Sequence, residues 1–223
     1  MHTPPFSNRS EAGSQLTELL SDFRDRYDAA VHALPRGGVP VGYEIAVDLN
    51  LPLDVIVVRK IGAPRNDELA MGAAASGGIT VRNDEVISDL SIEDAEFDRR
   101  ARDEHNEVRE REHRFRGYRP SLPIKGRTAI VVDDGIATGT TMRAALQVVR
   151  EQEPTQIVVA VPVAPIGTVE MLHEIADLAV CLATPDPYRS VGSHYDQFPQ
   201  VQDEDVRRLL DDAETYIRPG SGT

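Results

Sequence analysis

The chain has 223 residues, of which 40% are hydrophobic, and a formal net charge of −13 at pH 7. This length predicts one well-buried α/β core with an elaboration rather than two large domains. The acidic charge disfavours nonspecific binding to nucleic acid or anionic membranes, because both attract basic surfaces. No apolar run reaches the roughly 20 residues that span a bilayer. The start MHTPPFSNRSEAG lacks a basic-then-apolar leader, so we expect a cytoplasmic protein.

The first half of the chain shows two strand-to-helix units. Apolar spacing predicts, in chain order, a helix over residues 15–27, a strand over 29–34, a helix over 41–49 and a strand over 53–59. The second strand delivers Arg59 and Lys60 into a Gly- and Pro-containing segment, 61–78, for which we expect a mobile loop. Weak alternation around Gly77 and Gly78 predicts a short hairpin over 70–81.

The second half begins with a dense run of charges over residues 91–116. Its acids and arginines are spaced to pair on a helix surface, so we interpret it as a solvated helix. The elements predicted after it are a strand over 129–132, a helix over 142–152, a strand over 156–163, a helix over 169–175 and a strand over 178–183. The alternation of strands and helices predicts a parallel sheet with right-handed crossovers.

These patterns predict a single domain over residues 1–223, with a core over about 29–184, a charged helical insertion over about 91–116 and a C-terminal extension over about 185–217. Residues 218–223 have the composition of a frayed tail. The one cysteine, Cys181, lies in the apolar run ADLAVCLATP. This setting predicts a small buried side chain rather than a nucleophile or half of a disulfide.

The most informative segment is TAIVVDDGIATGTT, residues 128–141. Its apolar residues predict a strand that is covered on both faces, and Asp133 and Asp134 follow at the carboxyl end of this strand. Ligands of open α/β sheets bind beyond that end, and amides at the start of the next helix attract anions. Read separately, the acids could form a solvated turn or the site of a phosphotransfer receiver, and the Thr/Gly loop could cap a helix.

Read in order, the segment resembles the phosphoribosyl-pyrophosphate signature of type I phosphoribosyltransferases. The resemblance implies a parallel-sheet α/β fold flanked by helices, here with the charged helical insertion and a small hood-like C-terminal region. It also implies that Asp133 and Asp134 hold the ribose 2- and 3-hydroxyls and that the following loop binds the 5-phosphate. The loop residues are Ala137, Thr138, Gly139, Thr140 and Thr141.

The loop LPRGGVP follows the first predicted strand, where two glycines allow close approach of an anion and Arg36 offers a forked donor. Taken alone, a Gly-Gly turn is commonly structural. In the family that the chain resembles, this loop binds pyrophosphate and often contains a non-proline cis peptide. The resemblance therefore implies a pyrophosphate site at Arg36, Gly37 and Gly38.

Arg59 and Lys60 are similar to the pair of basic residues that precedes the flexible catalytic loop in several members of this family. Basic residues at a strand end are usually just solvated, but Lys60 is one of only two lysines in this acidic chain. We therefore interpret Arg59 and Lys60 as further pyrophosphate ligands.

The implied reaction is displacement of pyrophosphate from phosphoribosyl pyrophosphate by a nitrogenous base. Catalysis would come from Asp133, Asp134, Arg59 and Lys60, with Mg²⁺ as cofactor and no direct protein ligand to the metal. A third acid typical of hypoxanthine-guanine enzymes is replaced by Ala137, and DDGIATGTTM is closer to the adenine-enzyme loop. We therefore favour a purine whose identity stays open.

The acceptor pocket is expected in ATPDPYRSVGSHYDQF, which contains Asp186, Tyr188, His194 and Tyr195. Asp186 and Tyr188 are the acceptor candidates, because a carboxylate can accept from a base and an aromatic ring can stack on it. A surface turn explains the same residues. A nonenzymatic regulator that binds phosphoribosyl pyrophosphate or a nucleotide is the alternative function, since a fold does not establish turnover. Homo-oligomerisation also stays open.

Overall fold

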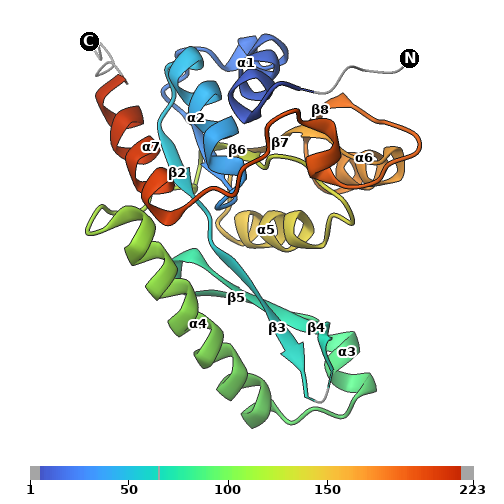
Figure 1. Cartoon of the computed structure of the whole chain (residues 1–223). Helices are drawn as coiled ribbons and strands as arrows, with labels where there is room; N and C mark the ends of the chain where they lie inside the picture. Colours follow the sequence, from blue (N-terminus) through green and yellow to red (C-terminus); the bar gives the residue numbers. More distant parts are fainter. Residues whose placement is uncertain (1–5, 65, 217–223) are drawn as a thin grey trace.

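The computed structural model describes residues 6–64 and 66–216. Its larger sheet is parallel and five-stranded, in the order β2-β1-β6-β7-β8 (Figure 1). The strands are β1 (Ala29–Ala33), β2 (Leu53–Val55), β6 (Thr128–Val132), β7 (Gln156–Val163) and β8 (Leu178–Ala183). This architecture confirms the predicted parallel-sheet α/β fold.

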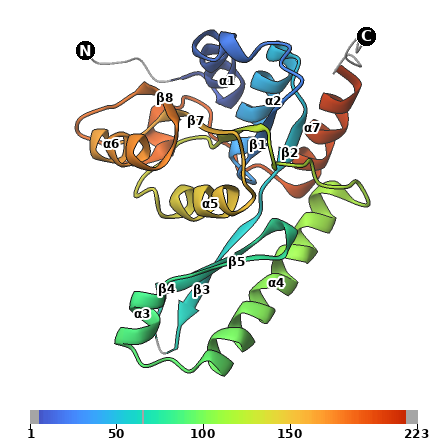
Figure 2. The same ribbon diagram turned by 180° about the vertical axis from the view of Figure 1, so that it is seen from behind.

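Helices cover both faces of the parallel sheet (Figure 2). One face carries α1 (Arg9–Leu19) and α2 (Gly38–Leu49), and the other carries α5 (Thr140–Glu151) and α6 (Ile166–Ile175). In β6, Ile130 and Val132 pack with α1 and α2, whereas Ala129 and Val131 pack with α5 and α6. Because both faces are buried, the strand reads as a continuous apolar run.

Four helices begin before the positions predicted from apolar spacing, and α5 does so by only two residues, at Thr140. α1 begins at Arg9 and ends at Leu19, with the short 3-10 helix η1 (Ser21–Phe23) after it, while α2 and α6 begin at Gly38 and Ile166. The Asn8 side chain caps α1 by accepting a hydrogen bond from the amide of Glu11 at 3.0 Å. Capping, glycine and proline residues occupy these first turns, so hydrophobic periodicity does not detect them.

A second, antiparallel sheet lies beside the first and consists of β3 (Val58–Ala63), β4 (Asn66–Ala75) and β5 (Ile79–Arg82). β4 and β5 form the predicted hairpin, which turns through η2 (Ser76–Gly78). The prediction of a mobile loop over 61–78 is wrong: apart from residue 65, outside the described part, this segment belongs mainly to β3 and β4. Ile61 and Met71 are fully buried there.

The single strand predicted over residues 53–59 is also wrong. The chain leaves the parallel sheet after β2 and joins the antiparallel sheet at β3. Between them, Val57 exchanges hydrogen bonds with Ser76: its amide donates to the serine Oγ at 2.9 Å, and its carbonyl accepts from the serine amide at 3.0 Å. The apolar run is continuous across this change of partner, so periodicity cannot show where one sheet ends and the other begins.

The charged helix is present as α4 (Asp94–Arg116), after the short α3 (Asp84–Asp89), and it runs along the second sheet (Figure 1). Its interpretation as a solvated helix is incomplete, because one side is apolar and packs with Ile61 and Met71. The buried side chains of this helix are Phe97, Ala101, Val108 and Phe115. Charged residues cover the rest of α4 and dilute the apolar pattern in the sequence.

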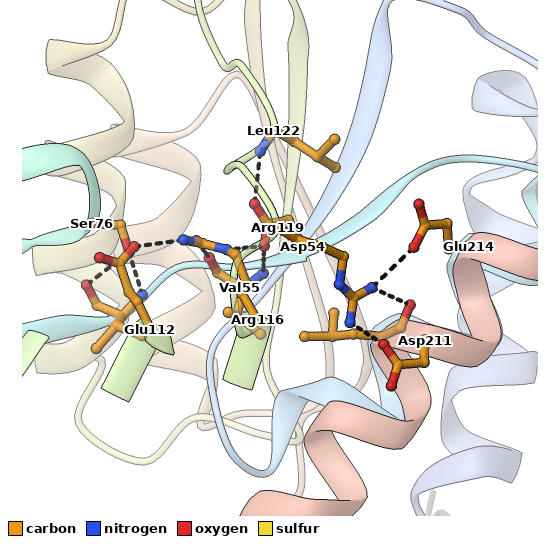
Figure 3. A network of polar contacts seen from close by, with 11 residues as sticks. Asp54, Val55, Ser76, Glu112, Arg116, Arg119, Leu122, Asp211 and Glu214 are labelled. Atoms are coloured by element: carbon orange, nitrogen blue, oxygen red, sulfur yellow. Dashed lines mark hydrogen bonds and ion pairs between the residues drawn. The ribbon is translucent and has the colours of Figure 1, made fainter. Parts of the chain in front are cut away.

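The end of α4 is joined to the parallel sheet by a buried ion pair (Figure 3). Arg116 Nε donates to Asp54 Oδ1 at 2.6 Å, and Arg116 Nη2 donates to the carbonyl of Val55 at 2.7 Å. The other Asp54 oxygen accepts from the amide of Leu122 at 2.8 Å. His32 pairs in register with Asp54, and burial lowers the pKa of His32 to about 4. This network fixes α4 against β2.

After β8, the chain crosses toward the carboxyl end of β6 and then forms α7 (Asp203–Tyr216), which packs against α2 and α4. This crossing contains η3 (Val191–His194), and Phe6 forms a parallel bridge with Tyr195. The predicted frayed tail, 218–223, lies outside the described residues. Over 6–64 and 66–216, no helix combines the length and apolar character needed to cross a membrane.

Candidate functional site

The acidic pair lies at the carboxyl end of β6, as predicted. Asp133 and Asp134 follow the last strand residue, Val132, and the amide of Asp134 donates to Asp133 Oδ1 at 2.9 Å. β6 is adjacent to β1 with Ala33 opposite Val132, so the loops that follow these two strands leave the sheet side by side. The sequence prediction that Asp133 and Arg36 follow the carboxyl ends of strands in a parallel sheet is confirmed.

The loop after β1 packs directly onto the acidic pair. A Cβ atom on Gly37 would lie 2.1 Å from Asp134 Oδ2, and one on Gly38 would lie 2.6 Å from the carbonyl oxygen of Val132. Both distances are far below van der Waals contact, so only glycine fits at these positions without displacement. The peptide bond between Pro35 and Arg36 is cis, as in the family that the sequence resembles.

The predicted phosphate loop leads into α5, whose N-cap is Gly139 with a φ of +77°. Thr138 and Thr140 are exposed, and their hydroxyl oxygens lie 3.2 Å apart. Thr168 donates from its hydroxyl to the carbonyl of Ala137 at 3.0 Å, which holds the start of the loop against α6. The loop therefore presents hydroxyls and the amino end of a helix, a combination suited to an anion. Thr141, in the first turn of α5, is exposed too.

Arg36 lies beside this centre but is paired with an acid. Its Nη1 atom is 3.2 Å from Asp203 Oδ1 at the start of α7, and both side chains are about one-third exposed, at 38% and 33%. The resemblance assigns pyrophosphate to the Arg36 guanidinium. In this structure the Asp203 carboxylate already contacts that guanidinium.

Arg59 and Lys60 do not lie at the end of a parallel strand, and that part of the sequence prediction is wrong. Both belong to β3 in the second sheet. Arg59 Nε donates to Glu104 of α4 at 2.8 Å. Both residues border a cavity of about 550 Å³ whose lining includes no residue of the two glycine-rich loops. Its other lining residues are Gly62, Asp67, Arg99, Arg100, Asp103 and Glu104.

Sequence reasoning missed Arg9, which makes the closest ionic contact at the centre. Its Nε atom donates to Asp134 Oδ2 at 2.7 Å, and its Nη1 atom donates to the carbonyl of Pro199 at 2.8 Å. The guanidinium carbon also lies 3.7 Å from the centre of the Phe198 ring. These partners are 125 to 190 residues away in the sequence, and Arg9 belongs to no recognisable motif, so no signal in the chain indicates this role.

The environment of the acidic pair disfavours two negative charges. Burial, and then the charge of Asp134, raise the pKa of Asp133 well above its ordinary value. Burial also raises the pKa of Asp134, against the opposing effect of the hydrogen bond from Arg9. Carboxylates with raised pKa values are typical of functional sites.

The C-terminal segment closes over the acidic pair. Tyr195 donates from its hydroxyl to the carbonyl of Asp134 at 2.6 Å. Tyr188 packs against His194 with ring centres 5.4 Å apart, and its buried hydroxyl has no hydrogen-bond partner among the described residues. Burial, and then the charge of Asp134, raise the pKa of Tyr188 to about 12. Tyr188 therefore lies near the centre, whereas Asp186 is exposed and precedes a cis proline bond.

The described residues contain no cluster of three or more His, Cys, Asp or Glu side chains able to hold a metal ion. Cys181 lies in β8 and is half-buried rather than fully buried, with its thiol directed to the carbonyl of Ala183 at 3.2 Å. Burial raises the pKa of the Cys181 thiol, which disfavours a thiolate. The centre thus consists of carboxylates, glycine-rich loops, hydroxyls and arginines.

Comparisons with known proteins agree with this geometry. The model of the phosphoribosyl transferase domain family matches residues 15–177. The chain is 43% identical over 208 residues to the Mycobacterium tuberculosis protein named "Putative phosphoribosyl transferase Rv0571c", a match that covers 93% of this chain and 47% of the relative. The chain thus spans about half the length of the curated relatives that it matches.

Among solved structures, the fold is similar to that of TT1426 from Thermus thermophilus, with a TM-score of 0.83 and 41% identity. This similarity covers 92% of the present chain and 97% of the Thermus chain. The family match includes both glycine-rich loops and the acidic pair, and the resemblance seen in the sequence is confirmed. The chain belongs to the phosphoribosyl transferase domain family.

Proposed function

We propose that this protein is a Mg²⁺-dependent phosphoribosyltransferase that displaces pyrophosphate from phosphoribosyl pyrophosphate with a nitrogenous base. The observation that carries this proposal is the contact between Gly37 and the Asp134 carboxylate, where a Cβ atom would lie 2.1 Å from Oδ2. This contact connects the loop that is assigned to pyrophosphate with the acids that are assigned to the ribose. One substrate with both groups can therefore occupy the two loops together.

The binding chemistry follows from the donors on each loop. The amino end of α5 and the hydroxyls of Thr138, Thr140 and Thr141 suit the 5-phosphate. The Arg36 guanidinium and the backbone at Gly37 and Gly38 suit pyrophosphate, for which arginine offers a forked donor. A carboxylate of the acidic pair suits the ribose hydroxyls, because ionised carboxylates accept hydrogen bonds and donate none.

Bond cleavage at C1 develops negative charge on the pyrophosphate and positive charge on the ribose ring. Arg36 stabilises the negative charge on the pyrophosphate by charge-assisted hydrogen bonds. The acidic pair, which is assigned to the ribose hydroxyls, favours the positive charge on the ring. Arg59 and Lys60 contribute only if the second sheet approaches the substrate, because they lie on β3 and Arg59 contacts Glu104.

Mg²⁺ prefers oxygen ligands and is commonly held by substrate phosphates, water and one or two carboxylates. The donor set fits an ion that arrives on its substrate, because the centre supplies hydroxyls and a few carboxylates and no cage of three acids among the described residues. When bound, the ion neutralises the pyrophosphate as it leaves. We assign it no protein ligand.

For the acceptor we propose a purine, bound near Tyr188. The ring of this tyrosine lies beside His194 in the segment that closes over Asp134. Its buried hydroxyl, without a partner among the described residues, offers a hydrogen bond to a polar edge of a base. Asp186 is exposed and is the weaker of the two acceptor candidates.

A specific observation favours a second candidate, a regulator that binds phosphoribosyl pyrophosphate or a nucleotide without turnover. Arg36 and Arg59, both assigned to the leaving group, contact Asp203 and Glu104. A regulator that binds a nucleotide without turnover has no need to free these side chains for a departing pyrophosphate.

The test is pyrophosphate release from phosphoribosyl pyrophosphate with Mg²⁺ and a panel of purines, pyrimidines and small amines. The enzyme hypothesis predicts base-dependent release that is lost in Asp133→Asn and kept in a matched surface control, Asp48→Asn, whose side chain is half exposed and pairs with Arg24. Tight binding of phosphoribosyl pyrophosphate with no release for any acceptor would favour the regulator. Absence of binding would contradict both.

A further inference from the structure

The loop assigned to the 5-phosphate is held in place by residues that lie outside the motif. The amide of Ile136 donates to the carbonyl of Val163, the last residue of β7, at 2.9 Å. Thr168, in the first turn of α6, donates from its hydroxyl to the carbonyl of Ala137 at 3.0 Å. The connection from β7 to α6 therefore supports the loop from one side.

The hydrogen bond from Thr168 fixes the orientation of one peptide group, the one between Ala137 and Thr138. This peptide bond is trans. In a planar trans peptide, the carbonyl and the amide that share the plane point in opposite directions. Because the carbonyl of Ala137 points to α6, the amide of Thr138 points away from that helix.

The amide of Thr138 is available to a ligand. Within the part of the chain that the structure describes, no hydrogen bond uses this amide. Thr138 is exposed, and the next residue, Gly139, is the N-cap of α5. An amide at the amino end of a helix attracts an anion, because the helix dipole adds partial positive charge there. If the peptide plane were turned over, the carbonyl of Ala137 would present partial negative charge instead.

Thr168 supports the loop through its methyl group as well as its hydroxyl. A Cβ atom on Gly139 would lie 2.6 Å from Met171 Cε and 3.3 Å from Thr168 Cγ2. The loop therefore lies directly on α6 at Gly139. The methyl group of Thr168 packs near Gly139, whereas its hydroxyl orients the peptide before Thr138, so the two contributions can be separated by substitution.

We infer that Thr168 is a positioning residue for binding of the 5-phosphate. Its hydroxyl holds the carbonyl of Ala137 away from the anion and thereby directs the amide of Thr138 toward it. This inference rests on the proposed function, which assigns this loop to the 5-phosphate. Thr168 does not touch the ligand, and it lies 31 residues from Ala137 in the sequence.

The experiment measures the binding of two probes, ribose 5-phosphate and magnesium pyrophosphate, to the full chain by calorimetry. Thr168→Val keeps the shape and a methyl group but removes the donor, so affinity for ribose 5-phosphate should fall about five- to tenfold. Affinity for magnesium pyrophosphate should stay within about twofold, because that ligand is assigned to the separate loop after β1. Equal losses for both probes, or no loss for ribose 5-phosphate, would overturn the inference.

Two further variants serve as matched controls. Thr168→Ser keeps the hydroxyl and removes the methyl group, so it should recover affinity for ribose 5-phosphate to within about twofold of the unchanged protein. In α7, Thr215 donates from its hydroxyl to the carbonyl of Asp212 at 2.7 Å, and Thr215→Val should leave both affinities unchanged. A larger loss with Ser than with Val at Thr168, or the same loss in Thr215→Val, would contradict orientation by the hydroxyl.

The amide of Thr138 reports the inferred orientation directly. In amide NMR spectra of the unchanged protein, the Thr138 resonance should shift as ribose 5-phosphate is added. In Thr168→Val, saturated with the same probe, this shift should be clearly smaller. The same shift in both proteins would overturn the inference, even if the affinity falls.

These measurements distinguish failure of the inference from failure of the proposed function. If ribose 5-phosphate binds equally well to Thr168→Val and to the unchanged protein, the role of Thr168 is wrong and the proposed function stands. If neither ribose 5-phosphate nor phosphoribosyl pyrophosphate binds the unchanged protein, the proposed function is wrong and the role of Thr168 fails with it.

Discussion

The acidic end of the site and its basic side are constructed differently. At the acidic end, Asp134 Oδ2 and Arg9 Nε are 2.7 Å apart, and the exposed fractions of the two side chains are 13% and 9%. On the basic side, Arg36 Nη1 and Asp203 Oδ1 are 3.2 Å apart, and the exposed fractions of the two side chains are 38% and 33%. The first pair is enclosed by the C-terminal segment and the Gly37 loop, while water reaches the second.

This difference separates a permanent contact from an exchangeable one. Breaking a buried ion pair leaves an unpaired charge in a poorly solvated place and is costly, whereas an exposed pair contributes little to stability. A phosphate can therefore replace the Asp203 carboxylate on Arg36 at small cost. It cannot replace Asp134 on Arg9 without disturbing the core of the site.

The largest expected effect comes from breaking the enclosed pair. Arg9→Met should lower the free energy of unfolding by about 3–5 kcal/mol, because the Asp134 carboxylate stays buried without its cation. The counterpart, Arg36→Met, should change it by less than about 1 kcal/mol. Urea unfolding at neutral pH measures both, and similar losses in the two variants would erase the distinction.

The next effect sharpens the comparison within the acidic pair. The raised pKa of Asp133 means that the folded state binds a proton more tightly than the unfolded state does. Ionised Asp133 therefore lowers stability at neutral pH, and Asp133→Asn should raise the free energy of unfolding by about 1 kcal/mol while it abolishes the proposed transfer.

The pH dependence checks the sign of this effect. As the pH falls through the raised pKa, the unchanged protein protonates Asp133 and regains that stability, so the advantage of Asp133→Asn should shrink. A loss of stability in the variant at neutral pH, or an advantage that grows in acid, would show that the Asp133 charge is well compensated.

A smaller effect is expected on the exposed side. Asp203→Asn removes the carboxylate that competes for Arg36, so affinity for magnesium pyrophosphate should rise about two- to fivefold, with stability within about 0.5 kcal/mol. Glu104→Gln is the matched variant at Arg59. If only Asp203→Asn increases the affinity in calorimetry, pyrophosphate contacts the β1 loop and not β3. The reverse result would place the leaving group at the second sheet.

The smallest effect concerns Tyr188. Its buried hydroxyl has no hydrogen-bond partner among the described residues, so Tyr188→Phe should change the free energy of unfolding by less than about 1 kcal/mol, toward greater stability. If the hydroxyl contacts the acceptor, the ratio of kcat/KM values between two purines should shift in the same variant. An unchanged ratio would remove Tyr188 from the acceptor pocket.

Local sequence patterns were sufficient for the two loops at the strand ends. β1 and β6 are buried on both faces and read as unbroken apolar runs, and the residues after such strands meet at one edge of a parallel sheet. The positions of Gly37 and Gly38 followed from the same reasoning. The strand over 53–59 failed because its apolar run passes from one sheet to the other without a break.

What the sequence alone determined is the order of the acidic pair, the glycine-rich loops and the strands before them, because each depends on neighbouring residues. Only the tertiary structure decided which acid has a cation and which arginine has a carboxylate. Arg9 and Asp134 are 125 residues apart, and Arg36 and Asp203 are 167 apart. Ion pairs across such separations carry no periodicity, since folding brings their partners together through the packing of α1, α7 and the C-terminal segment around β6.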